Sequence, residues 1–131
     1  MSEATEFLDL DDLITLADRL LGRPAPIRDL GLLGSAAARP QTSAFGADAY
    51  PDAWSKAEAL LQSIVNNHPL VDGNRRLGWL ATAVFLELNG VEAASNSNNE
   101  VYELVVGVAS GHQEIAEIAG ILRSAVESAP S

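Results

Sequence analysis

A histidine, an aspartate and two adjacent arginines lie close together in the stretch HPLVDGNRR, which runs from His68 to Arg76. A histidine can accept a proton near neutral pH, and an aspartate such as Asp72 can hold a magnesium ion that keeps several waters. Adjacent guanidinium groups, here those of Arg75 and Arg76, bind phosphate through charge-assisted hydrogen bonds. These residue types together indicate transfer of a phosphoryl or nucleotidyl group to a hydroxyl, chemistry that depends mainly on positioning and charge stabilisation.

The proline and the glycine of this stretch predict a loop that joins the end of one helix to the start of another. Pro69 disfavours helical backbone at His68, so the preceding helix should end at or just before the histidine. Asp72 is a candidate N-cap for the next helix, and Gly73 lets the backbone approach a ligand closely. Asn74 is placed either to orient a phosphate or to cap the loop.

The helix expected to begin near Gly73 carries unfavourable charges at its N-terminus. Helix N-termini favour anions, and an exposed cation in the first turn costs about 0.3–1 kcal/mol. Arg75 and Arg76 break this rule, and no Glu or Gln completes a capping box. Four other expected helices obey the rule, because each begins near an acidic residue: Asp9, Asp29, Asp52 and Glu100. An anion held by free backbone N–H groups and both guanidiniums would resolve the conflict, which predicts a phosphate site.

Each of these residues also has an ordinary structural explanation. A histidine before a proline is more often a capped or buried residue than a catalytic base. An aspartate at a helix start is more often an N-cap than a metal ligand, and neighbouring arginines usually form a solvated face. The functional hypothesis therefore rests on their joint arrangement in one turn at a helix start.

Composition limits the fold and the class of partner. A chain of 131 residues predicts one domain with a single core. With 47% hydrophobic but only 5% aromatic residues, closely packed helices are favoured over a β-sandwich. The net charge of −10 disfavours direct binding of nucleic acid, which normally requires a basic face. Because the chain has no cysteine, disulfides, thiolate nucleophiles and zinc–sulfur sites are excluded.

The sequence predicts a soluble, cytoplasmic protein without a membrane partner. Its N-terminus, MSEATEFLDLDD, is acidic and lacks the basic-then-apolar order of a signal peptide. No apolar run approaches the roughly 20 residues of a membrane span.

Apolar residues at helical spacing predict an all-α, compact bundle of about six helices, with the active-site loop at a helix N-terminus. The expected helices cover approximately residues 10–21, 29–39, 51–67, 73–89, 100–110 and 112–127. The segment 40–50, PQTSAFGADAY, shows no such period and is long for a connection in a small domain, which is typical of a functional loop.

The run from His68 to Arg76 resembles the core motif of Fic-fold proteins, and more closely that of the death-on-curing (Doc) branch, toxins of toxin–antitoxin modules. Similar segments are ARPQTSAFGADAYPD (38–52), KAEALLQSIVNNHP (56–69) and FLELNG (85–90), so the resemblance covers approximately residues 9–125. It implies a compact helical Fido fold, as a single domain over residues 1–131, with the motif at a loop-to-helix junction.

The resemblance also implies an activity and its cofactors, ATP and Mg2+. In the Doc branch the γ-phosphate of ATP is transferred to a threonine of elongation factor Tu, which arrests translation. On this chain His68 would be the base and Asp72 the magnesium ligand. The phosphate-binding residues would be Gly73, Asn74, Arg75 and Arg76, with the first two shaping the anion cradle.

The segment 40–50 corresponds to a flap that aligns the target protein, for which strand addition is one route. Arg39, Phe45 and Gly46 are the residues expected to help dock the target there. The partner implied is a cognate, Phd-like antitoxin with a disordered segment. Inhibition from within the chain is disfavoured, because Ser110 and Glu114 have the spacing of the family's inhibitory motif but are followed by Ile115.

Of the departures from the family pattern, two lie within the motif itself. Leu70 stands where a Phe is usual, and it should still anchor the loop in the core. Arg75 stands where the Doc branch typically carries Lys and where Fic-type enzymes, which transfer AMP, carry a small glycine. AMP transfer to a protein hydroxyl is therefore an alternative activity, and a catalytically silent helical module that binds a nucleotide or a partner is another.

Overall fold

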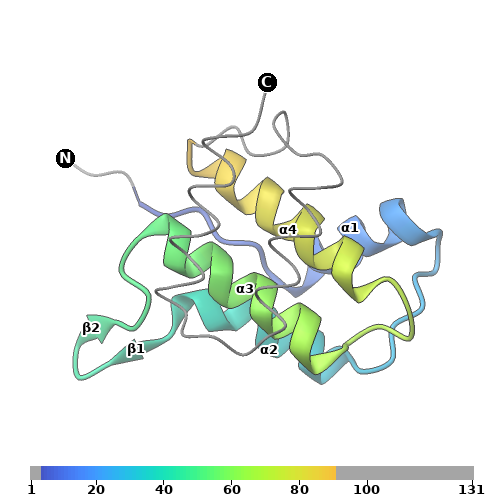
Figure 1. The fold of residues 1–131 in the computed structure, drawn as a ribbon, viewed down its shortest axis with the longest axis horizontal. Coiled ribbons are helices and arrows are strands. Elements are labelled where there is room, and N and C mark those ends of the chain that lie inside the picture. The colour runs from blue at the N-terminus through green and yellow to red at the C-terminus, as the bar shows by residue number, and fades with distance from the viewer. Residues whose placement is uncertain (1–3, 91–131) are drawn as a thin grey trace.

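Helices stack in layers on both sides of one central helix in the computed structural model, which describes residues 4–90. The central helix is α3 (Ala53–Asn67), which packs between α2 (Leu30–Ala38) and α4 (Asn74–Leu88) (Figure 1). Helix α1 (Leu10–Leu21) packs against α4 and α2. The sequence-based expectation of an all-helical architecture is confirmed for this part of the chain, apart from one short hairpin described below.

Three of the acidic residues expected at helix starts form N-caps, and the fourth, Glu100, lies outside the described residues. The Asp9 side chain accepts a hydrogen bond from the backbone N–H of Asp12 at 2.8 Å. Asp29 caps α2 through the N–H of Leu32 at 3.0 Å, and Asp52 caps α3 through the N–H of Ser55 at 2.7 Å. Each cap satisfies one of the backbone donors that a helix leaves free at its first turn.

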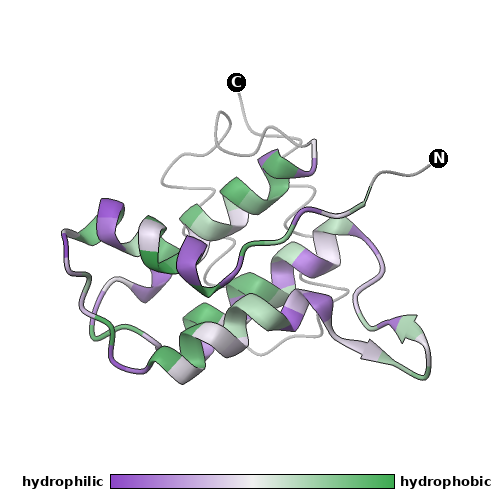
Figure 2. Ribbon diagram, turned by 180° about the vertical axis from the view of Figure 1, so that it is seen from behind, coloured by the Kyte–Doolittle hydropathy of each residue, from purple (hydrophilic) through white to green (hydrophobic). Residues whose placement is uncertain are grey.

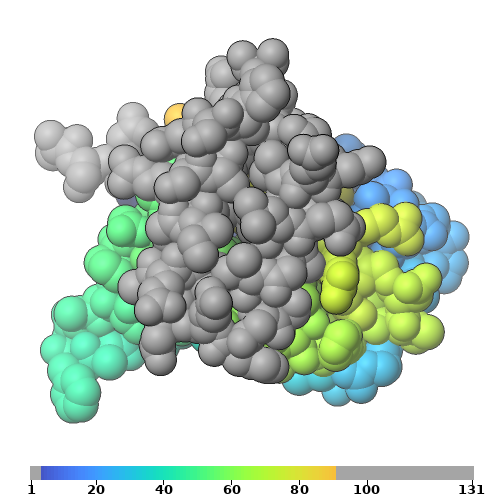
Figure 3. All heavy atoms as spheres, viewed as in Figure 1, coloured from blue at the N-terminus to red at the C-terminus, as the bar shows by residue number. Residues whose placement is uncertain are grey.

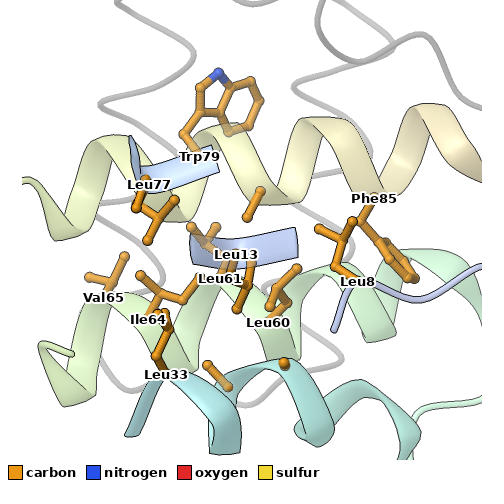
Figure 4. Packing of buried hydrophobic residues seen from close by; sticks show 14 of the residues in the cluster. Leu8, Leu13, Leu33, Leu60, Leu61, Ile64, Val65, Leu77, Trp79 and Phe85 are labelled. Atoms are coloured by element: carbon orange, nitrogen blue, oxygen red, sulfur yellow. The ribbon is translucent and has the colours of Figure 1, made fainter. Parts of the chain in front are cut away.

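The core lies on both sides of α3. All residues from 55 to 65 of this helix are buried, and α2 and α4 both pack against it. Leucines, Ile64 and Phe85 fill the space between the layers (Figure 4). Hydrophobic and hydrophilic residues alternate along the helices, as expected where a helix buries one face (Figure 2). Leu30 and Leu88, which the helical period places on inner faces, are about half exposed at 54% and 50%.

The segment expected to lack regular structure contains a small antiparallel hairpin. After a 3-10 turn, η1 (Arg39–Gln41), strands β1 (Ser43–Ala44) and β2 (Ala47–Asp48) pair, with Ala44 opposite Ala47. Phe45 and Gly46 form the turn with φ values of 54° and 81°. Two consecutive positive φ values match the twist of hairpin strands. The hairpin projects from the body of the molecule (Figures 1 and 3).

The count of about six helices is tested only in part. Four α-helices lie within residues 4–90, and both helices expected beyond residue 90 lie outside the described residues. In the part of the chain that the structure describes, no helix has the length and apolar character needed to cross a membrane.

Candidate active site

The chemistry-bearing residues of the motif meet in one hollow between the end of α3 and the start of α4. This hollow has a volume of about 370 Å³. It is lined by His68, Val71, Asp72, Gly73, Asn74, Arg75 and Arg76. The structure therefore brings together all six motif residues for which the sequence predicts a function.

His68 ends α3, as the following proline predicts. It is the C-cap residue and adopts a left-handed backbone conformation with φ 50° and ψ 60°. This conformation costs a non-glycine residue about 1–2 kcal/mol, so the surrounding structure must hold it in place. His68 is exposed and lines the hollow. A residue in this position is accessible from solvent.

The loop after His68 is anchored in the core by Leu70. This side chain is 1% exposed, which confirms that leucine at this position still docks the loop. Asn74 closes the loop, because its Oδ1 accepts from the Leu70 N–H at 2.9 Å and its Nδ2 donates to the Leu70 carbonyl at 3.0 Å. Of the two roles expected for Asn74, capping of the loop is the one that these contacts support.

The N-terminus of α4 begins one residue later than Asp72 would place it. Gly73 is the N-cap, with φ 87°, and no side chain caps the helix. The prediction of Asp72 as N-cap is therefore wrong. The left-handed backbone at Gly73 starts the helix after the turn, so the exposed Asp72 carboxylate stays outside the cap. A carboxylate released from capping is available to a metal ion.

Gly73 packs closely against a neighbouring side chain as well as having a positive φ. A Cβ atom at this position would lie 2.7 and 2.9 Å from the two terminal carbons of Leu21, at the end of α1. The sequence suggested that this glycine permits close approach of a ligand. In the structure Gly73 also lies close to Leu21 of α1. The sequence of the loop alone could not indicate this contact.

Arg75 and Arg76 lie in the first turn of α4 on the rim of the hollow, and both are exposed. No acidic residue occupies that turn. Within residues 4–90 one ion pair forms, between Lys56 and Asp48, so neither arginine is neutralised by a described carboxylate. Uncapped N–H groups and two guanidiniums without a described carboxylate partner are features that favour an anion at this helix end.

Residues expected to dock a target through the flap take different places in the hairpin. Phe45 and Gly46 form its tip, and the Phe45 side chain is fully exposed. Arg39 lies at the root instead. Its guanidinium donates to the Tyr50 hydroxyl at 3.1 Å and to Ser63 Oγ at 3.0 Å, and it lies 5.6 Å from the centre of the Tyr50 ring. These contacts make Arg39 an anchor of the hairpin rather than a free docking group.

Lys56 also fixes the root of the hairpin. Its ammonium group contacts Asp48 Oδ2 at 3.2 Å and donates a hydrogen bond to the backbone carbonyl of Tyr50. Although Lys56 is 4% exposed, both contacts satisfy its charge. The hairpin is thus joined to α3, the helix that ends at His68.

Glu58 is a buried acid that the sequence pattern did not single out. It is fully buried on α3, and neither carboxylate oxygen has a hydrogen-bond partner. Burial raises the pKa of Glu58 from 4.5 to about 8, and the positive charge of Arg39 opposes this rise. Its one signal in the sequence is a charge inside the apolar run AEALL, residues 57–61.

The residues of the hollow suit magnesium bound together with a phosphate, rather than a metal ion held by protein alone. Among the residues that the structure describes, no group of three or more His, Asp or Glu side chains converges on one point. Magnesium commonly binds through one or two carboxylates, its waters and substrate phosphates. Asp72 supplies one such carboxylate beside the anion site at α4.

Comparison with known proteins agrees with this geometry. A family model described as the Fic/DOC family matches residues 7–86, which include the hairpin and the hollow. The chain belongs to the Fic/Doc family. This Fic/Doc chain is also 43% identical over 126 residues to a protein named Toxin Doc from Mycolicibacterium smegmatis (strain ATCC 700084 / mc(2)155). The match spans 92% of this chain and 97% of that relative, so the resemblance seen in the motif is confirmed.

Proposed function

We propose that this Fic/Doc protein is the toxin of a toxin–antitoxin module and transfers the γ-phosphate of ATP to a hydroxyl of a target protein. Two comparisons support the class of activity: the Fic/DOC match, a family whose members are transferases that act on proteins, and the similarity to a relative named Toxin Doc. The observation that carries the chemistry is the uncapped start of α4. It presents two exposed arginines in the same hollow as His68.

In the proposed reaction His68 accepts the proton of the target hydroxyl while the hydroxyl oxygen attacks the γ-phosphorus. The bond between that phosphorus and the oxygen that bridges it to the β-phosphorus breaks, and ADP leaves. Arg75, Arg76 and the first N–H groups of α4 bind the phosphate oxygens and offset their charge. Asp72 would hold magnesium, which would supply further charge neutralisation.

The hairpin is the proposed docking element for the target. Both strands are exposed, so their free edges can pair with an extended segment of another protein. We assign elongation factor Tu as the target and a threonine as its acceptor, by extension from the Doc branch. A Phd-like antitoxin, with a segment that folds on binding, is the proposed inhibitor.

AMP transfer is the second candidate function. The presence of arginine at position 75 is the observation that supports it. An arginine presents a planar fork of donors where the Doc branch has the compact ammonium group of lysine. The two reactions differ in which phosphorus lies next to His68. Transfer of the γ-phosphate needs that end of the nucleotide beside the base, whereas AMP transfer needs the α-phosphorus there.

The position in ATP from which a labelled phosphorus reaches the target protein distinguishes these two reactions. Purified protein is incubated with magnesium, elongation factor Tu and ATP labelled at either the α or the γ phosphorus, and the label on the factor is counted. We expect label from the γ position alone. Label from the α position alone contradicts phosphate transfer and supports AMP transfer, and no label from either position supports a silent binding module.

Two variants and a matched control connect this reaction to the site. His68→Ala should lower the transfer rate by roughly 10²–10⁴-fold, since it removes the base. Asp72→Ala should weaken magnesium-dependent ATP binding and leave the fold intact, because the Asp72 side chain caps no helix. Arg19→Ala removes an exposed cation on α1 outside the hollow and should change neither property. Full activity in His68→Ala would exclude His68 as the base.

A further inference from the structure

We infer that Arg28 is a positioning residue that holds His68 in its left-handed conformation and so aims the imidazole into the hollow. The guanidinium of Arg28 donates from Nε to the His68 carbonyl at 2.8 Å and from Nη2 to the Asn67 carbonyl at 2.9 Å. Arg28 does not line the hollow, so its effect on any reaction there acts through His68. The inference rests on the proposed function in one respect, namely that His68 is the base.

The two carbonyls need a donor because they lie at the end of α3. The last carbonyl groups of a helix have no partner within the helix, and glycine is the usual residue where the chain turns left-handed after it. Here the turn falls on His68, a residue with a Cβ, and Pro69 follows it. A guanidinium fork satisfies two carbonyls at once, and its positive charge is favourable at a helix C-terminus.

Backbone contacts hold the same two segments together without the Arg28 side chain. The N–H groups of Arg28 and Asp29 donate to the Pro69 carbonyl at 2.8 and 3.0 Å. The Val71 N–H donates to the Pro26 carbonyl at 2.8 Å. Ile27 and Leu70 form an isolated antiparallel bridge between these contacts. Truncation of Arg28 therefore leaves the docking of the loop in place and releases mainly the peptide groups around His68.

The residues that position His68 are separate from those proposed to bind the nucleotide. The anion site consists of the α4 N-terminus, Arg75 and Arg76, none of which contacts Arg28 through a hydrogen bond in the described residues. The position of His68, by contrast, depends on the two peptide groups to which Arg28 donates hydrogen bonds. Loss of Arg28 should thus slow the chemical step and leave the affinity for ATP unchanged.

A kinetic comparison of Arg28→Ala, Arg28→Lys and the control Arg19→Ala tests this separation. We expect Arg28→Ala to lower kcat by roughly 10- to 100-fold with KM for ATP within about twofold of wild type, because misplacement of a catalytic group by an ångström has effects of this size. Arg28→Lys should be intermediate, since an ammonium group lacks the fork that reaches both carbonyls. Arg19→Ala should match wild type.

Nuclear magnetic resonance of histidine-labelled protein provides a readout that does not depend on activity. The chain has two histidines, His68 and His112, so the second serves as an internal reference. Arg28→Ala should shift or broaden the ring signals of His68, while Arg19→Ala leaves them unchanged. Should Arg28→Ala fail to fold, Arg28→Lys takes its place, and wild-type kcat together with unchanged His68 signals in that folded variant would overturn the inference.

Failure of the inference and failure of the proposed function give different results. If His68→Ala stays active, His68 is not the base and the proposed function fails. If His68→Ala is inactive while Arg28→Ala keeps wild-type kcat and His68 signals, Arg28 does not position the base. A raised KM for ATP with unchanged kcat in Arg28→Ala would place Arg28 in nucleotide binding and would also overturn the inference.

Discussion

Replacement of Glu58 by glutamine should make the protein more stable at neutral pH. Glu58 is fully buried on α3 and has no hydrogen-bond partner for either oxygen. Its ionised form is costly in this environment, and burial raises its pKa to about 8. Glutamine has nearly the same shape as the protonated acid and never ionises, so Glu58→Gln removes the titration with little change in packing.

The size of the effect follows from the two pKa values of Glu58, 4.5 when the side chain is surrounded by water and about 8 in the folded protein. Between them the folded protein keeps a proton that the unfolded chain has lost. The free energy of unfolding therefore falls as pH rises through this window, by about 1.4 kcal/mol per pH unit. From about pH 5 to about pH 7.5 the gap between Glu58→Gln and wild type should widen by about 3 kcal/mol.

Urea denaturation at several pH values measures this gap directly. Glu87→Gln is the matched control, because Glu87 is exposed on α4 and should follow the wild-type curve at every pH. A constant difference between Glu58→Gln and wild type across the window would refute the reasoning. It would mean that the Glu58 carboxylate has the same pKa in the folded and the unfolded chain.

Three further substitutions test the cradle around the hollow. Asn74→Ala should lower the free energy of unfolding in urea by about 1–3 kcal/mol, because it leaves the Leu70 backbone groups without partners, and an unchanged midpoint would exclude this role. Gly73→Ala should lower the free energy of unfolding, because of the positive φ at this position and the close contact of the new Cβ with Leu21. Adding Leu21→Ala in a double-mutant cycle should relieve the contact and recover part of the lost stability. Arg76→Ala should weaken ATP binding, more strongly at low salt, and equal affinity in a fluorescence titration would count against the anion site.

Local signals were sufficient for the starts of α1, α2 and α3 and for the loop at the motif. Asp9, Asp29 and Asp52 cap helices through contacts three residues away, so the sequence pattern contains both partners. The end of α3 follows from Pro69, whose ring restricts the residue before it. The hollow could be predicted for the same reason, since its residues all lie within a stretch of nine.

Features that depend on distant contacts could not be predicted. Gly73, the N-cap in place of Asp72, lies close to Leu21, which belongs to α1. Arg28 is 40 residues from His68, so no local pattern links the two. Every residue from 55 to 65 of α3 is buried, Glu58 included, whereas a helical period predicts one buried face.

The crystal structure of the protein with magnesium and a non-hydrolysable ATP analogue tests the central claim most directly. We predict that the phosphates contact the first N–H groups of α4, Arg75 and Arg76, with the γ-phosphorus nearest to His68. The α-phosphorus in that place would assign AMP transfer to the same site. A nucleotide bound elsewhere, with the α4 N-terminus empty, would contradict the account.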